Sequence, residues 1–69
     1  MTKHYIVRAV NYGIRRMFLT DIAADAEYRR LKRLSAQAAH IGLPTSPVMM
    51  LLGRDCIRAY IPAPRVHYV

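Results

Sequence analysis

The sequence predicts an α+β fold in which an N-terminal β-hairpin packs on one long amphipathic helix and a second apolar element follows. Three observations predict it: a strand-favouring N-terminal segment divided by turn residues, a helical apolar period after residue 20, and an apolar run before residue 53. The 69 residues suffice for a single small domain, residues 1–69. A domain of this size buries about 60% of its unfolded surface, so its stability margin is small.

The N-terminal hairpin is expected from residues 4–10 and 14–19, which are rich in residue types that favour strands. Residues 11–13, Asn-Tyr-Gly, separate them and provide turn chemistry, because glycine adopts a positive φ without strain. An alternative interpretation begins a helix at Ile14 that continues into the next segment.

One long helix is expected from Thr20 to Gly42. Thr20 or Asp21 can act as the N-cap, since its side-chain oxygen accepts an unpaired amide of the first turn. Gly42 ends the helix and Pro44 prevents its continuation. At ~100° per residue the apolar positions fall on one side. This predicted buried stripe consists of Ala24, Tyr28, Leu31, Leu34, Ala38 and Ile41.

Residues 47–60 fit two structures, and the sequence favours a short helix over a hairpin. The pair Ser46-Pro47 is typical of an N-cap and first helical turn. A helix would also gather its polar residues within an arc of ~100°, namely Arg54, Asp55 and Arg58. As a hairpin, residues 48–52 and 56–61 would flank a turn that begins at Gly53, a residue that costs a helix about 1 kcal/mol relative to alanine.

The positive charge of the chain predicts an anionic partner. The net charge is +7, from 11 Lys and Arg against 4 Asp and Glu. Such a balance fits nucleic acid, an anionic membrane or an acidic surface on another protein. In the helix, Asp25 can pair with Arg29 and Glu27 with Arg30. The expected charged contact consists of Arg29, Arg30, Lys32 and Arg33 on the helix, with Arg15 and Arg16 on opposite faces of the hairpin.

The sequence predicts no catalytic, cofactor or metal site. Its single thiol, Cys56, and its 3 histidines are scattered without the tight pairs that a zinc site uses. A nucleophilic Cys–His pair would need both side chains in reach of each other and a third group to orient the base. We expect Cys56 to be a small buried hydrophobe and the protein not to be an enzyme.

The apolar content predicts a protein contact. Hydrophobic residues make up 54% of the chain, more than so small a core can bury, so a protein partner or a homodimer is expected. Methionines adapt to irregular surfaces, and Arg and Tyr are common at interface hot spots. The expected apolar patch consists of Met49, Met50, Leu51 and Leu52, flanked by Arg54, Arg58 and Tyr60. Tyr12, at the hairpin tip, is expected to be an exposed contact.

These observations favour a small basic regulator that binds another protein stoichiometrically. By analogy with compact phage and mobile-element proteins, it would be an inhibitor or adaptor that blocks an acidic or nucleic-acid-binding surface of a host protein. The alternative is DNA or RNA binding, with the basic helix face on the phosphates. A cytoplasmic location is expected: the first residues lack the pattern of a secretion signal. The longest aliphatic run, residues 48–52, is far below the ~20 residues of a membrane span.

Overall fold

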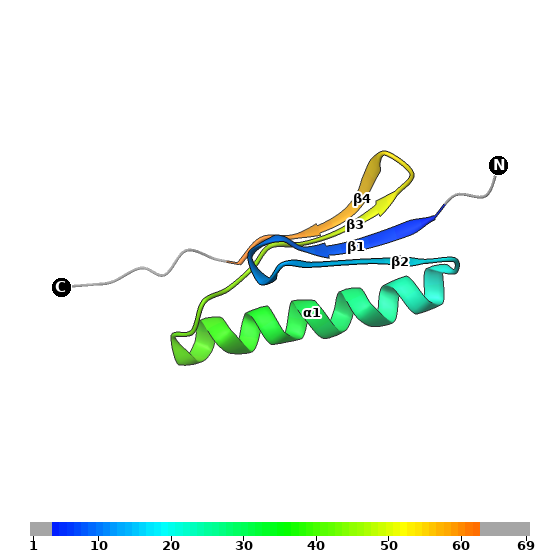
Figure 1. The fold of residues 1–69 in the computed structure, drawn as a ribbon. Coiled ribbons are helices and arrows are strands. Elements are labelled where there is room, and N and C mark those ends of the chain that lie inside the picture. The colour runs from blue at the N-terminus through cyan, green and yellow to red at the C-terminus, as the bar shows by residue number, and fades with distance from the viewer. Residues whose placement is uncertain (1–3, 63–69) are drawn as a thin grey trace.

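A four-stranded antiparallel sheet with one helix beneath it forms the described part of the chain, residues 4–62, in the computed structural model (Figure 1). The elements follow in the order β1 (Tyr5–Ala9), a 3₁₀ turn η1 (Val10–Tyr12), β2 (Ile14–Phe18), α1 (Asp21–Ile41), β3 (Val48–Leu52) and β4 (Asp55–Tyr60). The strands lie side by side in the order β2-β1-β3-β4. The predicted α+β class is confirmed, and α1 packs against one face of the sheet.

The N-terminal hairpin forms as predicted. β1 and β2 pair antiparallel, with Tyr5 opposite Phe18 at one end and Ala9 opposite Ile14 at the other. Gly13, with a φ of 65°, closes the turn, and its amide donates a hydrogen bond of 3.2 Å to the carbonyl of Val10. The alternative in which a helix begins at Ile14 is wrong, because that residue begins β2.

Both ends of α1 carry the predicted caps. The hydroxyl of Thr20 accepts a hydrogen bond of 3.3 Å from the amide of Ala23. Gly42, with a φ of 79°, allows the amide of Leu43 to reach back to the carbonyl of Ala38 at 2.8 Å. This is the Schellman arrangement, which satisfies carbonyls at a helix end that have no partner within the helix.

The predicted apolar stripe of α1 is buried in its first half and exposed in its second. Ala24, Tyr28 and Leu31 are buried, but Leu34 and Ile41 are 43% and 67% exposed. At Leu34 the reason is its position around the helix, because the next residue, Ser35, is 0% exposed and faces the core instead. At Ile41 the reason is length: 21 helical residues extend about 31 Å, whereas five strand residues extend about 17 Å. The end of α1 therefore projects beyond the sheet (Figure 1).

The preference for a helix over residues 47–60 is wrong, and the hairpin alternative is what forms. β3 and β4 pair antiparallel across a turn in which Gly53 has a φ of 63°. A positive φ at the first of two central residues fits the type II′ hairpin turn, where glycine is the usual residue. Ser46 does not cap a helix; its side chain and backbone bind Ser35 and Asn11 instead.

The hydrophobic core lies between α1 and the two central strands. Its buried residues come from β1, α1 and β3: Val7, Ala9, Ala24, Tyr28, Leu31, Val48 and Met50. Aromatic side chains border this cluster from the strands around it, namely Tyr5, Phe18 and Tyr60. Packing on one side of a sheet therefore accounts for the core of the described chain.

Hydrogen bonds, of which those of Ser35 are buried, attach the α1–β3 connection to the rest of the fold. The hydroxyl of Ser35 donates to the carbonyl of Ser46 at 2.8 Å and accepts from the amide of Ser46 at 3.0 Å. The amide of Asn11 donates to the hydroxyl of Ser46 at 2.9 Å. The hydroxyl of Tyr12 donates to the carbonyl of Pro44, also at 2.9 Å. Because these bonds join α1, η1 and the connection, they fix where β3 enters the sheet.

Candidate functional site

The sheet face that points away from α1 is the candidate site. In β1 and β3 the buried residues Val7, Ala9, Val48 and Met50 face the helix. Because strand side chains alternate between faces, their neighbours point the other way. We call this surface the open face. With the cross-strand partners in β2 and β4, it consists of Ile6, Arg8, Arg15, Met17, Met49, Leu51, Cys56 and Ala59.

The strand register arranges the open face in two rows that run across the sheet. One row is cationic at one end and contains Arg15, Arg8, Met49 and Ala59. The other row is apolar throughout and contains Met17, Ile6, Leu51 and Cys56. Strands in a sheet lie about 4.8 Å apart and alternate residues about 7 Å apart. The open face therefore combines an apolar area with a cationic corner on β1 and β2.

Arg8 and Arg15 are directly opposite each other in the β1–β2 pair. Like charges in that position destabilise a sheet, so the pair is costly in the isolated protein. Within residues 4–62, the ion pairs involve Arg16, Arg29, Arg30 and Arg58, and none includes Arg8 or Arg15. The two guanidinium groups of the cationic corner thus have no internal carboxylate partner in the described structure.

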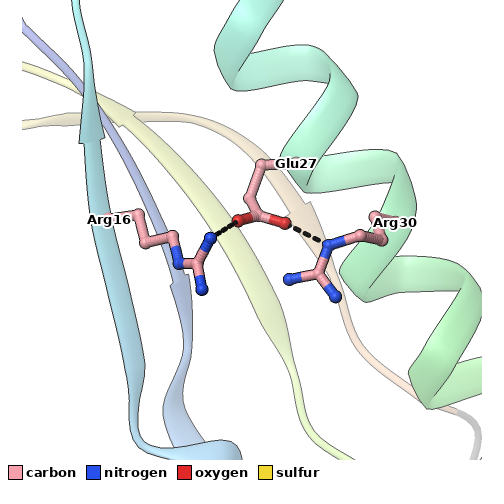
Figure 2. Close-up of polar contacts among 3 residues, drawn as sticks. All are labelled: Arg16, Glu27 and Arg30. Carbon is pink, nitrogen blue, oxygen red and sulfur yellow. Dashed lines mark hydrogen bonds and ion pairs between the residues drawn. The ribbon is translucent and has the colours of Figure 1, made fainter.

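The expectation that Arg15 and Arg16 face opposite sides of the hairpin agrees with the geometry. Arg16 lies on the helix side, where its Nη1 is 3.0 Å from Oε2 of Glu27 (Figure 2). Glu27 is 7% exposed and its Oε1 also accepts from Nε of Arg30 at 2.5 Å. This hydrogen bond, together with the charge of Glu27, raises the pKa of Arg30. Glu27 therefore holds the edge strand β2 against α1.

Asp25 makes a second bridge between α1 and the sheet, on the β4 side. It pairs with Arg29 at 2.9 Å, as the helical spacing predicted, and with Arg58 of β4. The Arg58 Cζ atom lies 4.3 Å from the centre of the Tyr28 ring, and Lys32 Nζ lies 5.5 Å from the centre of the Tyr60 ring. Much of the predicted charged contact on α1 is therefore engaged within the molecule.

Because Tyr28 is buried, we expect the free energy of unfolding to decrease at high pH. Burial raises the pKa of Tyr28 above its ordinary value of 10.0, more than the guanidinium of Arg58 lowers it. A folded-state pKa above the unfolded value leaves stability intact below pH 10 and removes it as the pH rises through the folded pKa. Between pH 9 and pH 11, urea unfolding should show a larger loss for the wild type than for Tyr28→Phe. Equal losses would contradict this assignment.

The predicted apolar contact is divided between different parts of the structure. Met49 lies on the open face, whereas Met50 is 3% exposed and belongs to the core. Leu52 and Tyr60 occupy helix-side positions of β3 and β4. Arg54 is exposed in the β3–β4 turn. The methionines that were expected to act together therefore lie on opposite faces.

Two further expectations are changed by the structure. Cys56 is exposed, so its interpretation as a buried hydrophobe is wrong; it lies on the edge strand β4, on the face that α1 leaves uncovered. Tyr12 lies at the hairpin tip as predicted, but it is half-buried rather than exposed, and its hydroxyl donates to the carbonyl of Pro44.

Sequence reasoning missed several open-face residues. They are Ile6, Arg8 and Ala59 as contact residues, with Met17 exposed beside them, whereas Leu51 belonged to the predicted apolar patch. One signal was present: residues 48–52 are apolar without alternation. Such a run is typical of a strand with apolar contacts on both faces.

Aromatic side chains of the described chain lie away from the open face. Tyr5, Phe18 and Tyr60 are at helix-side positions, Tyr28 belongs to α1 and Tyr12 to η1. Proteins that bind single-stranded nucleic acid on a sheet commonly stack bases on aromatic rings. Over residues 4–62, the open face offers aliphatic and thioether groups instead.

Comparisons of this chain with protein-family models, with curated proteins and with solved structures found no match. In the stretch that the structure describes, no helix is long and apolar enough to cross a lipid bilayer. The same stretch holds no group of three His, Cys, Asp or Glu side chains placed to bind a metal ion.

Proposed function

We propose that this protein is a non-catalytic binding protein whose open face contacts another protein stoichiometrically, as an inhibitor or an adaptor. The observation that carries the proposal is the composition of that face. An antiparallel sheet with one face in water normally carries polar residues there. Here Ile6, Met17, Met49 and Leu51 occupy such positions around the cationic corner. Covering these side chains would remove apolar surface from water, which favours association.

A protein partner fits this face better than nucleic acid does. Phosphate binding would use Arg8 and Arg15 but would leave the apolar row without a matching surface. Base stacking would need rings that the described part of this face lacks. DNA or RNA binding remains the second candidate because the chain has a net charge of +7.

A pair of alanine substitutions tests the proposed surface. Ala59→Glu places a charged side chain on the open face, whereas Ala36→Glu places the same side chain on the exposed surface of α1. Both positions are exposed, so both variants should fold, which circular dichroism and thermal melting would verify. We expect the immobilised wild type and the immobilised Ala36→Glu variant to bind the same protein from a lysate of source cells, and this binding should be saturable. Ala59→Glu should weaken that binding about tenfold or more.

Equal retention by Ala59→Glu and the wild type would overturn the open face as the contact surface. Titration with labelled DNA and RNA at low and high salt tests the second candidate, because phosphate-driven binding weakens steeply as salt increases. Tight nucleic-acid binding with that salt dependence, and with no saturable protein partner, would replace the proposed function.

A further inference from the structure

Resting on the proposed function, we propose that the open face recognises an amphipathic helical segment whose aspartate or glutamate lies about one turn from apolar residues. Arg8 and Arg15 bind that carboxylate together, while Ile6, Met49 and Leu51 contact the apolar side of the segment.

Charge is the first argument. Arg8 and Arg15 are opposite each other, and neither has an ion-pair partner within the described residues. Bringing a carboxylate between two guanidinium groups replaces a repulsion by charge-assisted hydrogen bonds, which are stronger than neutral ones. Arg16 already makes the equivalent contact within the fold, where it pairs with Glu27 on the opposite face. The cationic corner is thus complementary to an acid supplied from outside.

Charge also disfavours a second copy of this chain that packs through its own open face. The residues of the open face include two arginines and no carboxylate. Two copies packed through this face would bury four guanidinium groups without an opposite charge between the sheets. Burying a charge that lacks a partner is strongly unfavourable. A symmetric dimer through the open face therefore does not supply the acid.

Dimensions are the second argument. The rows that contain Arg8 and Ile6 are two residues apart along β1, a separation of about 7 Å. Residues four apart on a helix are separated by about 6 Å. A helix can therefore place an acid over the cationic corner and an apolar residue over the second row at the same time. Four strands span about 14 Å, enough for a helix about 10 Å in diameter.

Selection from a displayed library of random amphipathic segments tests this inference. We expect segments selected on the wild type to be enriched in Asp or Glu one helical turn from apolar residues. A synthetic segment from that pool should lose about tenfold in affinity when its acid becomes the amide. The segment with its acid intact should also bind the Arg8→Gln/Arg15→Gln protein about tenfold more weakly than it binds the wild type. Lys32→Gln/Arg33→Gln removes the same charge from α1 and should leave the affinity unchanged.

The outcomes separate this inference from the proposed function. Arg8→Gln/Arg15→Gln removes a repulsion, so the thermal stability of this variant should equal or exceed that of the wild type. That measurement would exclude misfolding as the cause of lost binding. Selected segments that bind Ala59→Glu more weakly but are not enriched in Asp or Glu would overturn the inference. The open face would then remain a protein-binding surface. Segments insensitive to Ala59→Glu would overturn the inference, and the partner-capture experiment then decides the proposed function by itself. Light-scattering evidence for a dimer that Ala59→Glu dissociates would also overturn it.

Discussion

Replacing Leu31 by alanine is expected to lower the free energy of unfolding by about 2–5 kcal/mol. Leu31 is the largest fully buried side chain in the described chain, with 0% exposure, and it lies in the cluster between α1 and the sheet. Its removal loses the transfer free energy of the deleted atoms and leaves a cavity that a close-packed core fills incompletely. Because a small domain has a total stability near the lower end of about 5–15 kcal/mol, this variant should be partly unfolded at room temperature.

Urea denaturation monitored by circular dichroism measures this effect through the shift in the midpoint. The matched control is Leu34→Ala, which deletes the same atoms three residues further along α1 from a side chain that is 43% exposed. We expect the control to lose less than half as much stability as Leu31→Ala. Similar losses at the two positions would mean that α1 does not present the face seen in the structure.

Ser35→Ala is expected to cost about 1–3 kcal/mol, although it removes a single oxygen atom. The lost hydroxyl both donates to the carbonyl of Ser46 and accepts from its amide, and both serines are 0% exposed. After the substitution, those backbone groups remain buried without their partner, and an unsatisfied buried group costs more than a typical hydrogen bond contributes. The substitution should also loosen the entry into β3.

Two measurements check this prediction. Denaturation gives the loss of stability, with Gln37→Ala on the exposed side of α1 as a control expected to stay within about 0.5 kcal/mol of the wild type. Amide hydrogen exchange should show the Ser46 N–H exchanging faster in Ser35→Ala than in either of the other proteins. Unchanged protection of that amide would contradict the assigned hydrogen bonds.

The elements that sequence predicted correctly are those defined by local chemistry. Gly13 determines the first turn, and Thr20 and Gly42 determine the two ends of α1, each through interactions with residues close in the chain. The prediction over residues 47–60 was wrong because long-range hydrogen bonds outweighed a local signal. Ser46-Pro47 resembles a helix start, but Ser46 is held by Ser35 and by Asn11, which is 35 residues away in sequence.

Part of the candidate site could be predicted from the sequence, because it too depends on residues close together in the chain. The opposition of Arg8 and Arg15 follows from the register of a hairpin that turns at residues 11–13. The position of Met49 beside Arg8 depends on the pairing of β1 with β3, which no local pattern specifies. The exposure of Leu34 depends on which side of α1 is packed, since the adjacent Ser35 is buried in its place, and the apolar period alone could not reveal this.

The position of β1 in the middle of the sheet has a consequence for biosynthesis. β1 is made first, yet one of its hydrogen-bonding edges is completed by β3, which is translated after the whole of α1. A nascent chain that has not reached residue 48 therefore carries a bare strand edge next to an unfinished core. Such edges pair readily with other chains. Premature termination within the helix should consequently yield aggregates, and productive folding should wait until translation has passed the third strand.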